Sequence, residues 1–254
     1  FDKKPIVLLD IEPLGARAFS CNAFCCPGPT CPCLGFTLYC FPLKPDLSDQ
    51  AVGEPFLKFH IDCNDQKITG ACTKKGTKNA GNVLAKALQN KLTKEDWNQL
   101  KSATIAEKEK NFASYDLESC KVVFPRDMLD DQSMMIHMVH VFPFYPGIEF
   151  TFQGKSVFIH DGYCVNPDCN CSEVNLQFFS ESLVQPESPE LGPYIDILYD
   201  LTEKKLKRTI SNESKDDPAL PEKFLQALQN ALPDINARLE KNRSLLRRHF
   251  ATWL

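Results

Sequence analysis

The sequence has little net charge and no long apolar run. Its 254 residues carry 29 Lys and Arg against 33 Asp and Glu, for a formal net charge of −4. Proteins that bind nucleic acid or anionic membranes by general electrostatics usually have a basic excess, so neither class is favoured. No stretch reaches the roughly 18 consecutive apolar residues that a membrane-spanning helix needs. The chain begins at Phe1 without a methionine, which indicates a trimmed or incomplete start.

Sequence signatures of catalysis are also missing. There is no glycine-rich phosphate loop, no nucleophile elbow and no serine or cysteine triad signature. The one basic stretch, residues 241–249, is more typical of the solvated face of a final helix than of a phosphate-binding surface. We therefore expect a protein without membrane contact, for which nucleic-acid binding is disfavoured and catalysis is not indicated.

Cysteine is the residue type that stands out. The chain has twelve cysteines, and most of them fall into two short runs. The runs comprise Cys21, Cys25, Cys26, Cys31, Cys33 and Cys40, and then Cys164, Cys169 and Cys171. Tight clustering with short, matching gaps favours metal ligands over a disulfide framework. Thiolate ligands in turn favour a reducing compartment, so we expect a cytoplasmic protein.

The two cysteine runs belong to a longer internal repeat. A shift of 138 along the sequence places Cys26, Cys31 and Cys33 on Cys164, Cys169 and Cys171. The same shift aligns residues 54–62 with residues 192–200, and a shift of 140 aligns residues 87–90 with residues 227–230. Segments of such different character keep nearly one register, which predicts a tandem duplication.

The predicted fold class is α+β, with each repeat a small, mostly antiparallel sheet that carries a cysteine-rich zinc loop. We expect a first repeat over residues 1–115, a linker over 116–138 and a second repeat over 139–254. Alternating apolar residues predict a strand after each cysteine loop and a hairpin further on. Each repeat is expected to close with a helix, over residues 79–101 and 221–248, the second of which Pro233 kinks or splits.

The spacing in the cysteine loops predicts two zinc ions per chain. The ligands expected in the second repeat are His160, Cys164, Cys169 and Cys171, four donors within twelve residues. The ligands expected in the first repeat are Cys21, Cys26, Cys31 and Cys33, although the three-residue gap after Cys21 would select Cys25 instead of Cys26. Four sulfur or imidazole donors suit the tetrahedral coordination of structural zinc.

Filled coordination shells point to a zinc-stabilised, non-catalytic interaction module with a protein partner. A first alternative is a metal-dependent hydrolase or nuclease that works in a cleft between the repeats. The carboxylate and lysine patterns around Asp62 and Asp200 suit that chemistry, but they fit a polar β-turn better. A second alternative is nucleic-acid binding through the zinc loops. Those loops contain no lysine or arginine, which disfavours it.

Other cysteines and histidines are expected to be structural. Cys40 occupies a strand position where the second repeat has Phe178, so core packing is the favoured interpretation. His137 and His140 interrupt an apolar run, which is more typical of hydrogen-bonded or edge histidines than of metal ligands.

Overall fold

The chain forms two compact units, Phe1–Ser114 and Tyr115–Leu254. The computed structural model describes residues 6–11, 15–42, 55–72, 78–122, 135–166, 168–180, 193–212 and 217–251. The fold is α+β, with one antiparallel sheet in each unit and a helix at the C-terminal end of the chain. The predicted fold class is confirmed at this level.

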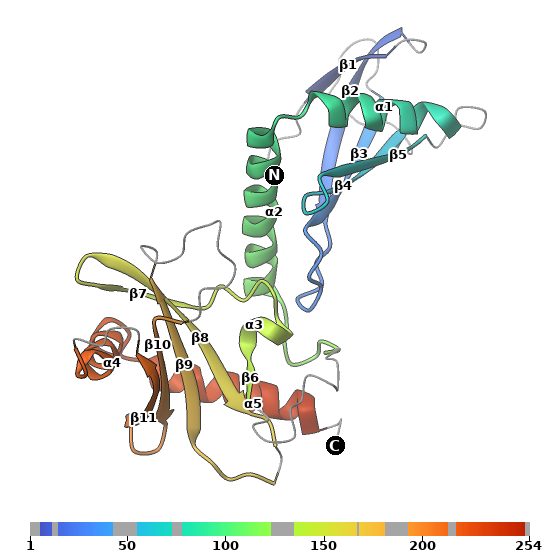
Figure 1. Ribbon diagram of the computed structural model, residues 1–254. Helices are drawn as coiled ribbons and strands as arrows, with labels where there is room; N and C mark the ends of the chain where they lie inside the picture. Colours follow the sequence, from blue (N-terminus) through green and yellow to red (C-terminus); the bar gives the residue numbers. More distant parts are fainter. Residues whose placement is uncertain are drawn as a thin grey trace. The chain divides into compact units, whose positions relative to one another are not determined.

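The first unit is a five-stranded antiparallel meander followed by two helices (Figure 1). Its elements are β1 (Ile6–Ile11), β2 (Gly15–Cys25), β3 (Gly35–Pro42), β4 (Leu57–Asp62), β5 (Lys67–Cys72), α1 (Lys78–Lys91) and α2 (Lys94–Ser114). Burial alternates along β4, where Leu57 and Phe59 are buried between the exposed Lys58 and His60. This two-residue period gives the sheet one face for the core.

The second unit has a six-stranded sheet with the order β11-β10-β9-β8-β6, and β7 also pairs with β8. Its elements are β6 (Met135–His137), α3 (Met138–Val141), β7 (Ile148–Phe152), β8 (Lys155–Cys164), β9 (Glu173–Ser180), β10 (Ile195–Asp200), β11 (Lys205–Asn212), α4 (Leu220–Ala231) and α5 (Ile235–Ala251). Residues 135–138, which the sequence placed in a linker, belong to β6 and α3.

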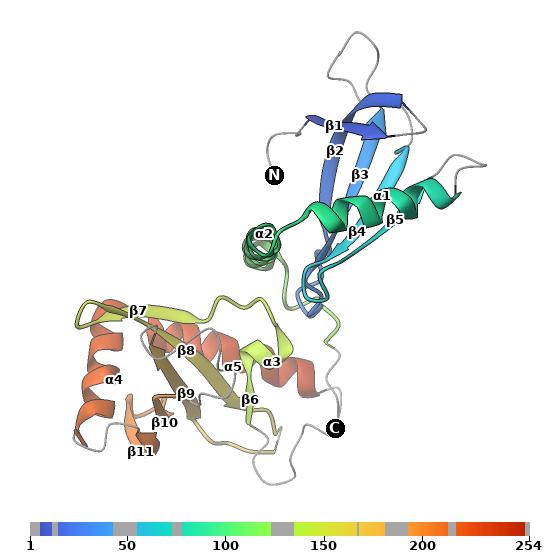
Figure 2. The same ribbon diagram turned by 45° about the horizontal axis from the view of Figure 1, so that its top comes forward.

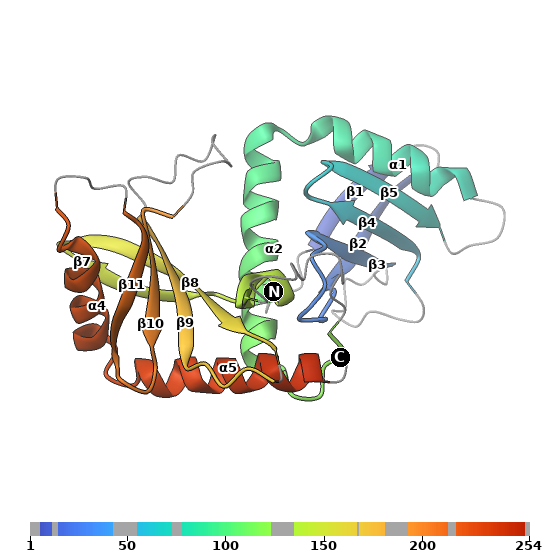
Figure 3. The same ribbon diagram turned by 60° about the horizontal axis from the view of Figure 1, so that its bottom comes forward.

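In the second unit, α4 and α5 contribute to the core on one face of the sheet (Figure 3). Phe224 of α4 packs edge-on against Phe178 of β9, with ring centroids 5.5 Å apart. Asn242 of α5 donates a hydrogen bond of 2.9 Å to Asp161, which is completely buried on β8. The C-terminal helix is therefore held both by apolar contacts and by a buried polar network.

In the first unit, α1 lies directly on β5 (Figure 2). A Cβ atom added to Gly70 of β5 would lie 2.2 Å from the carbonyl oxygen of Gly81 in α1. Only a residue without a side chain fits there, so the two glycines allow the helix backbone to approach the strand closely. In the second unit, α4 contacts β11, the counterpart of β5, and also β7.

Each closing segment forms two helices, where the sequence predicted one helix in the first repeat and a helix kinked or split at Pro233 in the second. In the second unit the break falls at residues 232–234, which include Pro233. In the first unit the break falls at Leu92 and Thr93. Thr93 Oγ1 accepts a hydrogen bond from the Asp96 backbone N–H, and Asp96 accepts one from the Thr93 N–H. This reciprocal cap starts α2 and ends the continuity with α1.

The two sheets have the same strand register over their central strands. Every partner pair between β2 and β3, and between β3 and β4, recurs between β8 and β9, and between β9 and β10, at the sequence offset of 138. In the last hairpin, two register shifts lengthen β11 relative to β5, so that Leu57 faces Cys72 whereas Ile195 faces Asn212. These bulges are where the offset changes from 138 to 140.

Candidate metal centre

Two groups of three cysteines lie at the same place in the two sheets. Cys26, Cys31 and Cys33 lie in the loop between β2 and β3, and their sulfur atoms are all within 4.8 Å of one another. Cys164 ends β8, while Cys169 and Cys171 lie in the loop before β9, and their sulfurs meet the same limit. Four sulfurs around one zinc ion lie about 3.8 Å apart, so both groups are compact enough to share an ion.

The loops that hold the cysteines have the same local structure. In the first, the Cys31 backbone N–H donates to the Gly28 carbonyl at 3.2 Å, and in the second the Cys169 N–H donates to the Asn166 carbonyl at 3.2 Å. Both turns place the second cysteine of the group beside the first. The loops also end alike: the Cys63 N–H donates to the Leu34 carbonyl, and the Leu201 N–H donates to the Ser172 carbonyl.

A lysine from α2 holds the first loop. Lys108 Nζ donates to the Cys31 carbonyl and to Cys33 Sγ, both at 3.2 Å. The Lys108 side chain is buried, with 3% of the residue exposed. A buried lysine head group needs hydrogen-bond acceptors, and the Cys31 carbonyl and Cys33 Sγ supply them.

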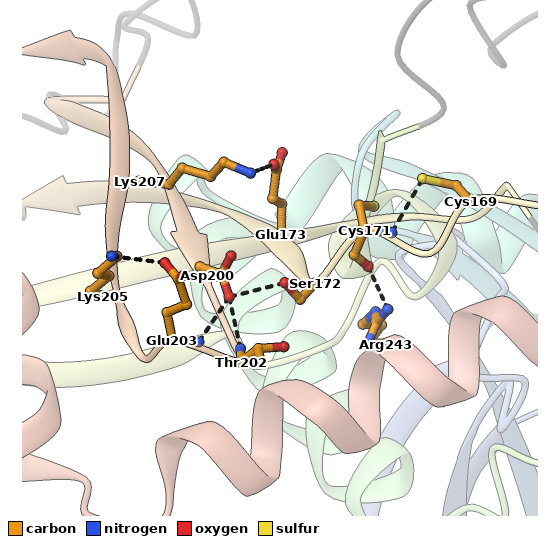
Figure 4. A network of polar contacts seen from close by, with 10 residues as sticks. All are labelled: Cys169, Cys171, Ser172, Glu173, Asp200, Thr202, Glu203, Lys205, Lys207 and Arg243. Carbon is orange, nitrogen blue, oxygen red and sulfur yellow. Dashed lines mark hydrogen bonds and ion pairs between the residues drawn. The ribbon is translucent and has the colours of Figure 1, made fainter.

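Arginines from α5 hold the second loop. Arg247 donates to the Cys164 carbonyl at 3.1 Å and to the Cys169 carbonyl. Arg243 donates to the Cys171 carbonyl, as Figure 4 shows. The carbonyls of Cys31 and Cys169 occupy equivalent positions, so in both units a cation from the closing helix reaches the same point of the loop. A planar guanidinium, with several fixed donors, can bridge two carbonyls at once.

The thiols of each group have unequal pKa values. Burial raises the pKa of Cys31, whereas the hydrogen bonds from Cys31 and Lys108 and the charge of Lys108 overcome burial to lower the pKa of Cys33. In the second group, the Cys171 N–H lowers the pKa of Cys169, and burial with the neighbouring Cys169 raises that of Cys171 to about 12. Each group thus contains one thiol with a lowered pKa, and a bound cation would favour the ionised form of all three.

The structure does not bring Cys21 or His160 into these groups. Each lies four residues before the end of a continuous strand, β2 or β8, rather than in the loop. Four strand residues span about 13 Å, which is too far for a shared ion. Cys21 Sγ lies 3.2 Å from Cys40 Sγ, and the His160 ring packs on Phe179 with centroids 4.7 Å apart. The three-residue gap that suggested both ligands is therefore spacing along a strand.

The ambiguity between Cys25 and Cys26 has a structural answer. Cys26 belongs to the first group, whereas Cys25 is the last residue of β2 and is buried in the core of the first unit. Adjacent residues at the end of a strand point to opposite faces, so only one of the two can face the loop.

The carboxylates of the hydrolase alternative lie at the ends of β4 and β10, where the hairpin turns begin. Asp62 Oδ1 accepts hydrogen bonds from the N–H groups of Asn64 and Asp65, at 2.9 and 3.1 Å. In the second unit, Asp200 Oδ1 accepts from the N–H groups of Thr202 and Glu203, at 2.8 and 2.9 Å (Figure 4). Each carboxylate is thus used to form the turn, as expected for aspartate in this position.

Substituting Asp200 with alanine should lower the urea midpoint of the second unit and weaken its acid dependence. Hydrogen bonding, chiefly from the Glu203 N–H, lowers the pKa of Asp200 in the folded protein. A carboxyl with a lowered folded pKa stabilises the fold above the unfolded pKa of about 3.9, and this contribution disappears as pH falls through the folded value. Urea unfolding of both proteins at pH 7 and pH 3 measures it. An equal difference at both pH values would contradict this assignment.

Three histidines, two on the second sheet and His140 in α3, lie near one another without forming a group of ligands. The rings of His137 and His140 have centroids 5.4 Å apart, and the His137 ring lies directly over Gly162. Burial lowers the pKa of His137 to about 4 and also lowers that of His160. Within the described residues, only the two cysteine groups bring three potential ligand atoms within 4.8 Å of one another.

Lys108, Arg243 and Arg247 are the residues of the site that sequence analysis missed. The arginines fall in the basic stretch 241–249, which the sequence alone assigned to a solvated helix face. The sequence contains one indirect indication of their role. Lys108 and Arg247 are separated by nearly the repeat offset, so they occupy nearly equivalent positions in the two repeats.

Comparisons with known proteins add no relative. No protein-family model, no curated protein and no solved structure matches this chain. Among the helices of the described residues, none is both long and apolar enough to cross a membrane. The functional argument therefore depends on the two cysteine groups and their surroundings.

Proposed function

We propose that this chain is a tandem duplication of a zinc-stabilised α+β unit that serves as a non-catalytic interaction module. It would hold two structural zinc ions, one at Cys26, Cys31 and Cys33 and one at Cys164, Cys169 and Cys171. The observation that carries the proposal is the recurrence of one arrangement in both units. A three-cysteine loop joins equivalent strands, and a cation from the closing helix holds the same loop carbonyl.

The duplication is supported by more than the cysteines. The strand partners of the central strands in one sheet recur in the other at a sequence offset of 138. Two bulges in β11 add two residues, which explains why the helices that follow match at an offset of 140. The hairpin turns also correspond, since Gln66 and Lys204 both have positive φ angles, of 50° and 55°. Unrelated sheets would not share register, turn geometry and capping carboxylate together.

The donor set favours zinc among the common metals. Three thiolates are soft ligands, which suit zinc and disfavour magnesium or calcium. A [4Fe–4S] or [2Fe–2S] cluster normally takes four cysteines. All twelve cysteines and all five histidines are among the described residues, and neither group has a fourth member of these types. The fourth zinc ligand in this proposal therefore comes from outside these two groups of residues, for example from a water molecule or a partner.

A structural role is favoured over a catalytic one by the surroundings of the sulfurs. A catalytic zinc site needs a general base beside the metal-bound water. Within the described residues, no carboxylate or imidazole lies in either group. Three thiolates also reduce the Lewis acidity of zinc. Instead, an ion at either site would tie together the two strands that flank the loop, so its binding energy would stabilise the sheet.

A module of this kind works by presenting its surface to a protein partner, and its thiolates remain available in a reducing compartment such as the cytoplasm. Net charge gives no general attraction to nucleic acid. The shared turns formed by Asp62 and Asp200 leave the hydrolase alternative without its metal-binding carboxylates.

Metal analysis of the full chain tests the proposal. We expect close to two zinc ions per chain after purification without added metal, and close to one after Cys171→Ser. Cys72→Ser is the matched control, because Cys72 lies outside both groups, and it should retain both ions. A protein that binds no zinc, or that keeps both ions after Cys171→Ser, would overturn the assignment.

A further inference from the structure

Two cysteines outside the metal groups face each other in the core of the first unit. Cys21 of β2 and Cys40 of β3 are direct partners in the antiparallel register. Their sulfur atoms are 3.2 Å apart, and the residues are only 2% and 1% exposed. Among the described residues, no third metal-binding side chain joins them to form a group.

The fold does not require sulfur at this place. The equivalent partners in the second sheet are Ile159 and Phe178, both completely buried. An apolar pair of ordinary size therefore satisfies the packing between these two strands. Facing thiols in the first unit consequently call for a chemical explanation beyond core packing.

The geometry suits a covalent bond between the two sulfurs. Directly opposed residues of antiparallel strands have Cα atoms about 4.5–5.5 Å apart, within the range of roughly 4.4–6.8 Å found for disulfides. The sulfurs need to approach from 3.2 Å to about 2.05 Å, which modest side-chain rotations can provide.

The position of the pair connects it to the first cysteine group. Cys21 precedes the loop and Cys40 follows it, so a bond between them would close a ring of chain that contains Cys26, Cys31 and Cys33. We propose that Cys21 and Cys40 are an oxidation site whose disulfide cross-links β2 to β3 and so holds together the two strands that carry the first metal loop. The second loop, flanked by Ile159 and Phe178, has no such cross-link.

The reaction is a thiol–disulfide exchange with a low-molecular-weight disulfide such as glutathione disulfide. The hydrogen bond with Cys40 lowers the pKa of Cys21 and raises that of Cys40, so Cys21 is the first nucleophile. Its thiolate bonds to one glutathione sulfur and releases the other glutathione. Cys40 then loses its proton and bonds to the Cys21 sulfur, releasing the second glutathione. Two protein thiols are oxidised, and one glutathione disulfide is reduced to two glutathiones.

Burial limits the rate of this reaction. Access to either sulfur requires β2 and β3 to separate briefly, so exchange should be slow in the folded protein and faster near its unfolding midpoint. Most thiols of the metal groups are more accessible than this pair and would react first unless an ion holds them. The zinc-loaded protein is therefore the proper starting material.

The first experiment equilibrates the zinc-loaded full chain in glutathione buffers, blocks the remaining thiols by alkylation and maps linked peptides by mass spectrometry. We expect a product that lacks two hydrogens and contains a link between Cys21 and Cys40. The paired variant Cys21→Ile with Cys40→Phe carries the residues of the second sheet, so it should fold without forming the link. Absence of the link, or a link only between Cys31 and Cys33, would overturn the proposal.

The second experiment measures the consequence for the metal. The oxidised protein should release the zinc of its first site to a chelator at least several-fold more slowly than the reduced protein, with release from the second site unchanged. Its thermal midpoint should rise by roughly 10 °C, because the cross-link constrains the unfolded chain. Equal release rates in both states would overturn the coupling to the loop.

These two readouts separate the inferences. The cross-link is detected without reference to any ion, whereas the chelator experiment rests on the proposed metal function. A chain that forms the link but never binds zinc would contradict the metal function and leave the oxidation site established.

Discussion

Removal of zinc is expected to unfold both cysteine loops and to cost on the order of 10 kcal/mol per site. This cost is comparable with the roughly 5–15 kcal/mol by which domains are normally stable. In each unit the loop joins neighbouring strands of the central sheet, so its loss should propagate into β2 and β3 or into β8 and β9. Circular dichroism and urea unfolding after dialysis against a chelator measure the effect.

The control for metal removal is reversibility. Zinc added back at two equivalents should restore the original unfolding midpoint, whereas magnesium should not, because it prefers oxygen ligands. Cys33→Ser should make the first unit insensitive to the chelator while the second unit still responds. A chelated, metal-free protein with an unchanged midpoint would rule out a structural role for the ions.

Replacement of Arg247 with alanine is expected to destabilise the second unit and to speed zinc release from its site. The Arg247 guanidinium donates to the carbonyls of Cys164, at the end of β8, and Cys169, within the loop. Its removal leaves two carbonyls without these donors, and the loss of hydrogen bonds from a charged group should cost on the order of 2 kcal/mol. The measurements are the urea midpoint and the rate of zinc transfer to a coloured chelator.

Arg248→Ala is the matched control, because Arg248 is the next residue on the same helix. Its partner is Glu118, in an exposed ion pair at the surface. The substitution should therefore leave the urea midpoint and the rate of zinc transfer nearly unchanged. Arg247→Lys should fall between the two, since an ammonium keeps the charge but cannot bridge both carbonyls with a planar fork. If Arg247→Ala behaves like Arg248→Ala, the arginine does not hold the loop.

Much of the candidate site was predictable because its spacing is local. Cys26, Cys31 and Cys33 are close in sequence with three prolines between them, so one turn suffices to bring their sulfurs together. The repeat offset then identified the same three positions in the second unit. The hairpin turns at Asp62 and Asp200 were predictable for the same reason, because an aspartate caps the backbone two and three residues ahead.

The fourth predicted ligands illustrate where local spacing misleads. A gap of three residues brings side chains together on a helix or in a loop, but along an extended strand it separates them by about 13 Å. Cys21 and His160 lie on such strands, and sequence alone did not reveal how far β2 and β8 extend before their loops begin. The break between α1 and α2 was similarly hidden, although the Thr93 and Asp96 pair is the signal that marks it.

By itself the sequence determined the α+β class, the matching offset of the two halves and the three cysteines of each group, since all depend on patterns within short stretches of chain. Only the tertiary structure decided which cations reach the loops, because Lys108 and Arg247 come from helices that are distant from those loops in sequence. It also decided that Cys21 faces Cys40 rather than a metal, because strand register sets that pairing. Contacts between distant segments follow from how sheets and helices pack, and the spacing within one segment does not contain them.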